Sequence, residues 1–179
     1  MATEKVAIYI DGGNFYRRLK DPQIAAPLGK IFDFNKFVNH LLNGRTLVSK
    51  RYYVGIVRDI DGSAKSVAMV RNQQKFLAEL TNGGFTVKRG RIVYDHTIRE
   101  KGVDVKLATD LVIGAFENIY DTAIIVSSDT DLIPAIEYVK YKKKKVEYIG
   151  FSHKPSLGMI KESDINVLLQ KKDIDTFVL

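Results

Sequence analysis

The sequence predicts an α/β fold in which helices cover a doubly wound, mainly parallel sheet. Short apolar runs rich in β-branched residues recur along the chain, and runs of this kind are typical of strands buried in parallel sheets. Stretches with helical periodicity lie between them. No linker or repeat divides the 179 residues, so we expect a single domain spanning 1–179.

Strands are expected where the apolar runs are continuous. They are Lys5–Ile10, Thr46–Val57, Phe85–Val93, Ala123–Val126, Val146–Phe151 and Ile165–Leu169. Helices are expected where apolar residues return every three or four positions. They are Phe15–Lys20, Phe34–Leu42, Ser63–Leu80, Val103–Ile119, Leu132–Val139 and Pro155–Lys161. Asp33 or Asn35 can cap the second helix, Gly44 closes it, and Gln23–Ile31 is expected to be a loop.

The composition is that of a globular protein and excludes several kinds of chemistry. Apolar residues make up 45% of the chain. The absence of cysteine excludes disulfides, thiolate-bound zinc and cysteine nucleophiles, and the few histidines are scattered. The apolar run Val6–Ile10 is too short for a signal-peptide core, and no run is long enough to span a membrane. We therefore expect a cytoplasmic protein without membrane contacts.

A polar run, Ser127–Asp131, follows the buried strand Ala123–Val126 and precedes a helix. In open α/β sheets, ligands bind beyond the carboxyl ends of the strands. Asp129 and Asp131 are two residues apart and repel each other unless a cation lies between them. Ser, Thr and Asp are also ordinary N-cap residues, so capping of the next helix explains this run equally well.

Two further aspartates decide between these readings. Asp11 ends the first strand, and it faces the same crevice as Asp129 if their strands are neighbours. Asp104 lies in the first turn of the helix that starts at Val103, a place where the helix dipole also favours an acid. Asp110 follows on the same helix after a rotation of about 600° about its axis, so the two side chains lie on different faces of the helix. Asp104 is the better placed of the two to reach the crevice.

Carboxylates that converge at one crevice predict a divalent cation. Their mutual repulsion at neutral pH destabilises the site unless a cation offsets it. Oxygen ligands without cysteine or histidine favour Mg²⁺ or Mn²⁺. Such a centre suits the activation of water against a phosphodiester.

Three motifs in the chain resemble a known family. They are Tyr9-Ile10-Asp11-Gly12-Gly13-Asn14, Lys101-Gly102-Val103-Asp104 followed by Asp110, and Ser127-Ser128-Asp129-Thr130-Asp131. Their order and spacing, from about Lys5 to Phe151, resemble the NYN domain in its LabA-like branch, within the PIN-like ribonuclease superfamily. The resemblance implies a three-layer α/β/α PIN-like fold and metal-dependent cleavage of RNA.

The resemblance also implies roles for individual residues. The metal-linked acids would be Asp11, Asp104 and Asp129, with Asp131 as a fourth. Asn14 and Ser127 would be polar supports of the catalytic site. One departure is Ser128, where the family often has glycine.

The excess of basic residues points to a polyanionic partner. Lys and Arg number 28 against 21 Asp and Glu, a net charge of +7. The expected contacts with the RNA backbone are Arg17, Arg18, Arg89, Arg91, Arg99 and Lys101. The run Lys142–Lys145 is expected to be a solvated face. Tyr16 and Tyr94 can stack on bases, whereas Tyr53 is expected in the core.

The sequence thus predicts a metal-dependent ribonuclease that hydrolyses RNA phosphodiesters through an aspartate-ligated Mg²⁺ or Mn²⁺ centre. The expected action is endonucleolytic, and the expected partner is single-stranded or structured RNA, with a homodimer left open. The alternative is a non-catalytic RNA-binding or regulatory interaction module that retains the acidic site. A haloacid-dehalogenase-type phosphatase would need an Asp-x-Asp on the first strand, where the chain has Asp11-Gly12-Gly13. A Toprim-type enzyme would need a glutamate in place of Asp11.

Overall fold

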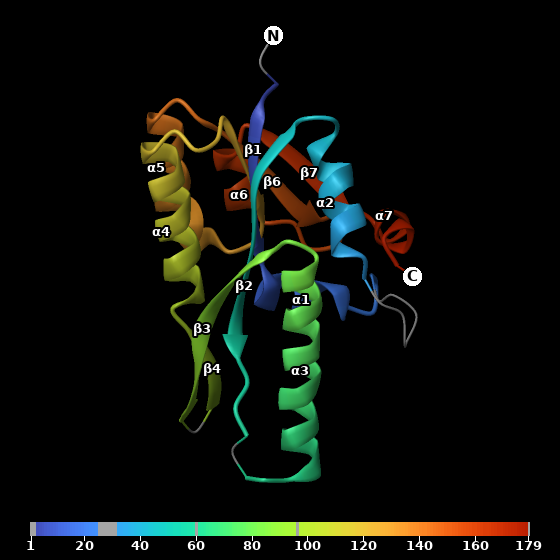
Figure 1. Cartoon of the computed structure of the whole chain (residues 1–179). Coiled ribbons are helices and arrows are strands. Elements are labelled where there is room, and N and C mark those ends of the chain that lie inside the picture. Colours follow the sequence, from blue (N-terminus) through green and yellow to red (C-terminus); the bar gives the residue numbers. More distant parts are fainter. Residues whose placement is uncertain (1–2, 25–31, 60, 96, 179) are drawn as a thin grey trace.

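A seven-stranded sheet with helices on both faces forms the body of the protein (Figure 1). The computed structural model describes residues 3–24, 32–59, 61–95 and 97–178, with the backbone alone for 92–95 and 97–100. The strands are β1 (Lys5–Asp11), β2 (Thr46–Ile56), β3 (Thr86–Asp95), β4 (Thr97–Lys101), β5 (Thr122–Val126), β6 (Lys145–Phe151) and β7 (Ile165–Leu169). The helices are α1 (Gly12–Leu19), α2 (Phe34–Leu42), α3 (Ala64–Asn82), α4 (Val103–Phe116), the 3-10 turn η1 (Thr130–Leu132), α5 (Ile133–Tyr141), α6 (Leu157–Glu162) and α7 (Lys171–Thr176).

The strand order is β4-β3-β2-β1-β5-β6-β7, and every neighbouring pair is parallel except β3 and β4. Strands β1 and β5 are therefore neighbours, as predicted for the strands that end in Asp11 and precede Asp129. The chain leaves β1 toward β2 on one side and later returns to β5 on the other side. This reversal is a topological switch point, where α/β sheets open a crevice for ligands.

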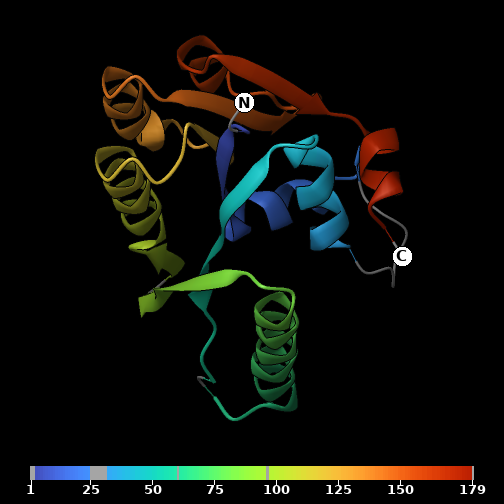
Figure 2. The same cartoon turned by 45° about the horizontal axis from the view of Figure 1, so that its top comes forward.

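Two hydrophobic cores lie on opposite faces of the sheet. Side chains alternate along β1, so that Val6, Ile8 and Ile10 enter one core while Ala7 and Tyr9 enter the other. Helices α1, α2, α3 and α7 cover the first core, and α4, α5 and α6 cover the second (Figure 2). The arrangement confirms the predicted three-layer α/β/α fold.

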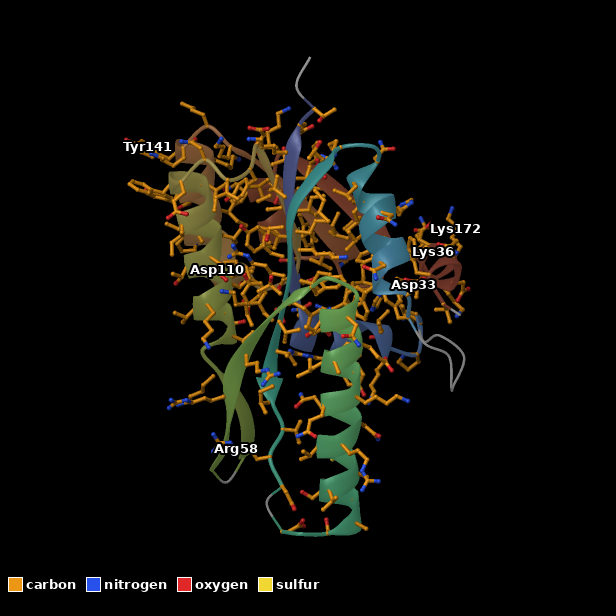
Figure 3. All side chains as sticks on the ribbon, in the orientation of Figure 1. Asp33, Lys36, Arg58, Asp110, Tyr141 and Lys172 are labelled. Carbon is orange, nitrogen blue, oxygen red and sulfur yellow. The ribbon has the colours of Figure 1, made fainter. Side chains whose placement is uncertain are left out.

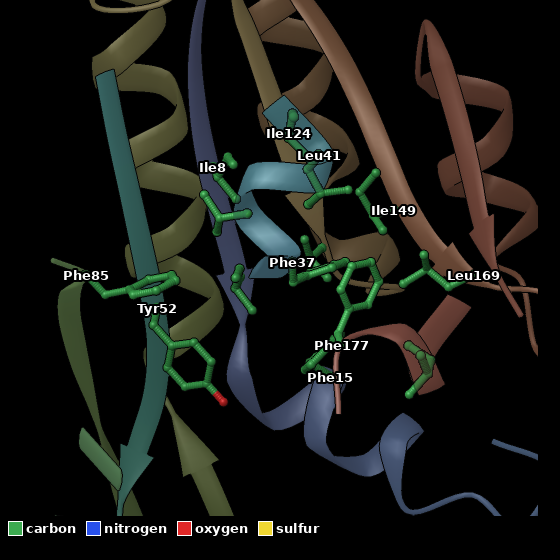
Figure 4. Packing of buried hydrophobic residues seen from close by; sticks show 14 of the residues in the cluster. Ile8, Phe15, Phe37, Leu41, Tyr52, Phe85, Ile124, Ile149, Leu169 and Phe177 are labelled. Atoms are coloured by element: carbon green, nitrogen blue, oxygen red, sulfur yellow. The ribbon is translucent and has the colours of Figure 1, made fainter. Parts of the chain in front are cut away.

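Packed aromatic rings fill the first core (Figure 4). The ring of Phe15 in α1 lies 5.7 Å from that of Phe37 in α2, and Phe37 lies 5.2 Å from Phe177 near the end of the chain, measured between ring centroids. All three rings are nearly inaccessible to solvent. Burying each one contributes about 1.5–3 kcal/mol, so this core fixes α1, and with it the end of β1, against the sheet.

Helix α1 starts earlier than predicted. It was expected from Phe15, but Gly12 and Gly13 already belong to its first turn because Asp11 caps it. The carboxylate of Asp11 accepts a hydrogen bond from the backbone N–H of Asn14 at 3.0 Å. A Cβ at Gly12 would lie 2.4 Å from the ring of Tyr52, so only glycine permits this close approach.

Two elements were missed and several boundaries differ. Strand β4 is charged and pairs antiparallel with β3, and α7 is a six-residue helix beyond the last predicted strand. Helix α4 ends at Phe116, before the predicted Ile119, because Asn118 adopts a left-handed backbone with φ 53°. Asp33, and not Asn35, caps α2 by accepting from the N–H of Lys36 at 2.9 Å. Most of the predicted loop Gln23–Ile31 lies outside the described residues.

Helix α3 extends away from the rest of the molecule (Figure 2). Its buried residues, Leu77 and Leu80, both lie in its second half. The side-chain amide of Gln73 joins the helix to the end of β2, donating to the carbonyl of Gly55 and accepting from the N–H of Val57, both at 2.8 Å. No helix in the described ranges is both long and apolar enough to cross a membrane.

Candidate metal centre

Asp11 lies at the carboxyl end of β1 and is 5% exposed. Besides the N–H of Asn14 on one oxygen, its other oxygen accepts a hydrogen bond from the hydroxyl of Ser127 at 2.8 Å. Burial raises the pKa of Asp11, the two hydrogen bonds lower it, and the nearby charges of Asp104 and Asp129 raise it again. The net shift of the pKa is upward, which means that keeping the Asp11 carboxylate ionised destabilises the folded protein.

Asp129 lies in the loop that follows β5, the strand next to β1, and is half-buried. Its carboxylate accepts from the N–H of Asp131 at 2.9 Å and thereby caps η1. Its own N–H donates to Ser127 Oγ at 3.2 Å. Asn14 completes the connection, because its side-chain carbonyl oxygen accepts from the N–H of Ser128 at 3.3 Å. Asn14 and Ser127 therefore join the β1–α1 turn to the loop after β5.

Asp104 reaches the same place from the first turn of α4. Its side chain is more exposed than those of Asp11 and Asp129. Burial raises its pKa first, the charges of Asp129 and Asp131 raise it further, and Arg17 lowers it. One carboxylate oxygen from each of Asp11, Asp104 and Asp129 lies within 4.8 Å of the others. The three acids come from two strand ends and one helix start, at the switch point of the sheet.

Asp131 and Asp110 lie outside this group of three. Asp131 is exposed, and its charge still raises the pKa of Asp104. Asp110 faces the sheet further along α4, where it accepts a hydrogen bond from the hydroxyl of Tyr53 at 2.7 Å. Asp110 and Asp104 thus face different directions, as the helical rotation predicted, whereas no role for Asp110 was predicted from the sequence.

The predicted RNA contacts come from two parts of the fold, helix α1 and the pair of strands β3 and β4. Arg17 and Arg18 belong to α1, and Arg17 is exposed and close enough to lower the pKa of Asp104. Arg91 and Lys101 are exposed and paired in register across β3 and β4, and exposed Arg89 lies two residues before Arg91. Arg99 and Tyr94 were also predicted to contact RNA, but only their backbone is described in the structure.

The other aromatic and basic predictions have clear outcomes. Tyr53 is fully buried, as expected for a core residue, whereas Tyr16 is 57% exposed with the ammonium of Lys20 4.3 Å from its ring centre. The run Lys142–Lys145 lies at the amino end of β6, whereas Asp11 and Asp129 lie at or beyond the carboxyl ends of their strands. Within the run, Lys144 pairs with Asp121 at 3.7 Å.

The sequence pattern did not reveal the residues that hold α4 against the sheet. Arg51 and Lys88 pair with Asp110 at 3.1 and 3.4 Å, beside Tyr53. A signal was present in β2, because Arg51 and Tyr53 are two residues apart and so share one face of the strand. That face places a charged residue beside buried Tyr53, a member of the second core.

The fold and the acids define a parallel α/β protein with a candidate carboxylate metal centre at its switch point. The NYN domain family model matches residues 5–177, and the chain belongs to that family. NYN domains are generally of the ribonuclease type and belong to the PIN-like superfamily. The LabA-like branch stays a prediction.

A solved structure shares the fold of this chain. The crystal structure of a protein of unknown function, VPA0982 from Vibrio parahaemolyticus RIMD 2210633, is similar with a TM-score of 0.70 and 24% identity. The match covers 99% of this chain and 97% of that one. This likeness supports the fold alone. The search of curated proteins found no match.

Proposed function

We propose that this protein is a metal-dependent ribonuclease in which Asp11, Asp104 and Asp129 hold Mg²⁺ or Mn²⁺. The observation that carries the proposal is the convergence of their three carboxylates within 4.8 Å, in a chain of the NYN family. Hard oxygen ligands without thiolate or imidazole fit these two cations. The upward pKa shifts of Asp11 and Asp104 fit too, because a cation would offset the repulsion that contributes to them.

The surrounding residues keep the acids in place. Ser127 donates to Asp11 and accepts from the backbone of Asp129, so one hydroxyl orients acids from two strands. Asn14 fixes the β5 loop against α1 through the N–H of Ser128. We assign Asp131 to the solvent-exposed rim of the site. A divalent cation bound here would polarise a phosphoryl oxygen and lower the pKa of water.

RNA would lie across the acids between two basic groups. Arg17 and Arg18 on α1 form one, and Arg89, Arg91 and Lys101 on β3 and β4 form the other, with Arg99 in the same ribbon. Contacts of this kind bind phosphates without reading bases, which makes the affinity sequence-tolerant and dependent on salt.

The test compares Asp129→Asn with the matched control Asp33→Asn in Mn²⁺-dependent cleavage of single-stranded, structured and transfer RNA. Both residues cap helices, but Asp33 lies at the start of α2 and outside the acidic group. We expect wild type and Asp33→Asn to cleave alike, and Asp129→Asn to bind RNA without cleaving it. Cleavage by Asp129→Asn at the wild-type rate would refute the ribonuclease proposal. RNA binding without cleavage by wild type would favour the non-catalytic alternative.

A further inference from the structure

Asp110 lies on α4 (Figure 3) and belongs to a second polar cluster, which joins this helix to the sheet. One of its carboxylate oxygens accepts from Tyr53 Oη at 2.7 Å and pairs with Arg51 Nη1 at 3.1 Å and Lys88 Nζ at 3.4 Å. The carboxylate is 17% exposed and the Arg51 side chain 19% exposed. Hydrogen bonds and ion pairs this sheltered from water are stronger than those at an open surface.

Three consecutive residues of β3 contact three levels of α4. Lys88 pairs with Asp110, and the carbonyl of Arg89 accepts a hydrogen bond from Lys106 Nζ. Gly90 lies against the first residue of the helix, since a Cβ there would come within 2.3 Å of Val103 Cγ2. The start of α4 is thus held in one register along β3.

The same cluster connects α4 with the strand that carries Asp11. Tyr9, two residues before Asp11 in β1, donates its hydroxyl to the backbone carbonyl of Asp110 at 3.4 Å. Its ring stacks on that of Tyr53 with a centroid distance of 6.4 Å. Burial raises the pKa of both phenols, so Tyr9 and Tyr53 remain protonated donors.

Helix α4 lacks a side-chain cap that would fix its first turn. Its N-cap is Gly102, with φ 79° and no side-chain hydrogen bond. The position of Asp104 therefore depends on the packing of Val103 and on contacts further along the helix. A rise of 1.5 Å per residue puts Asp110 about 9 Å along the axis from Asp104, on the same rigid segment.

We infer that Asp110 is a positioning residue for the metal centre: its contacts with Arg51, Tyr53 and Lys88 hold α4 so that Asp104 meets Asp11 and Asp129. The inference rests on the proposed function, since it concerns the same metal centre. Asp110 acts through the helix and does not ligate the cation.

The test measures Mn²⁺ affinity by calorimetric titration, well below the unfolding temperature, in wild type, Asp110→Asn and Tyr53→Phe. The control is Glu147→Gln, which removes another sheltered carboxylate, one that lies in β6 and pairs with Arg45. We expect Asp110→Asn to weaken Mn²⁺ binding about tenfold, Tyr53→Phe less, and Glu147→Gln by under twofold at a similar loss of thermal stability. Tyr53→Phe carries the test if Asp110→Asn does not fold.

Amide hydrogen exchange across 103–109 without metal gives a second readout. We expect Asp110→Asn to speed exchange there several-fold and Glu147→Gln to leave it unchanged. If Asp110→Asn binds Mn²⁺ like wild type, or if Glu147→Gln weakens binding as much, the positioning role is wrong. If wild type binds no Mn²⁺, the metal centre of the proposed function fails, and unchanged exchange in Asp110→Asn would then refute the role in holding α4.

Discussion

Replacing Asp129 by asparagine should stabilise the metal-free protein and abolish its stabilisation by Mn²⁺. Asparagine caps a helix about as well as aspartate, so the bond to the N–H of Asp131 persists while one of three neighbouring charges disappears. For two unit charges 4.8 Å apart, Coulomb's law gives about 3.5 kcal/mol at an effective dielectric constant of about 20 and about 0.9 kcal/mol in bulk water.

The gain should lie near the lower of these values. Asp104 is exposed and Asp129 half-buried, so solvent screens much of their repulsion. We therefore expect the free energy of unfolding of the metal-free variant to rise by about 1 kcal/mol. For a chain of this size that corresponds to an increase of about 2–4 °C in Tm.

Calorimetric melting in EDTA and in excess Mn²⁺ gives both readings in one experiment. Wild type should gain about 2.7 kcal/mol when Mn²⁺ is present at a hundred times its Kd, whereas Asp129→Asn should gain little. Asp33→Asn should match wild type in both buffers. A metal-free Asp129→Asn that is no more stable than wild type would refute the repulsion argument, and an equal Mn²⁺ effect in both proteins would remove Asp129 from the site.

Three further outcomes follow from the same geometry. Replacing Arg89 and Arg91 together by alanine should reduce the slope of log affinity for RNA against log salt by roughly one to two units; a filter-binding series at several salt concentrations that gave parallel lines would exclude them as phosphate contacts. Ser127→Ala removes the hydroxyl shared by Asp11 and Asp129 and should weaken Mn²⁺ binding about 10- to 100-fold in a calorimetric titration, with unchanged affinity as the contrary result. Burial raises the pKa of Asp11 in the folded protein, so protonation of Asp11 stabilises the folded state when no metal is present. This stabilisation is present below the ordinary pKa of aspartate and is lost as the pH rises through the raised pKa. Denaturant melts from pH 4 upward should show a smaller loss in Asp11→Asn than in wild type, because the raised pKa of Asp104 remains in the variant, and Mn²⁺ affinity should fall as pH falls through the same range.

The sheet could be predicted because its central strands are continuous apolar runs, and parallel strands buried on both faces have this pattern. Strand β4 has no such pattern: its sequence, Thr97–Lys101, is largely charged, and it is a strand because it pairs with β3. Helix α7 buries only Ile174, and a capping box formed by Gln170 and Asp173 holds its first turn. Six residues offer too few turns for a periodic signal.

The places of Asp11 and Asp129 could be predicted because ligands bind beyond the carboxyl ends of parallel strands, and the ends of both strands were visible in the sequence. The role of Asp110 could not, because its partners come from separate strands: Arg51 in β2 and Lys88 in β3 are 59 and 22 positions away along the chain. Helical rotation showed only that Asp110 and Asp104 face different directions. Identifying the strand that Asp110 faces required the packing of α4 on the sheet.

Capping and metal binding are compatible roles for Asp11 and Asp129. Each carboxylate has about four lone-pair sites, and its cap uses one of them: the N–H of Asn14 for Asp11, and that of Asp131 for Asp129. The caps hold the two side chains in one orientation, so a cation would meet oxygens that are already ordered. Aspartate and asparagine are therefore nearly equivalent for the fold at these positions and very different for the cation. That difference is why the asparagine variants separate the two roles, whereas alanine would remove both.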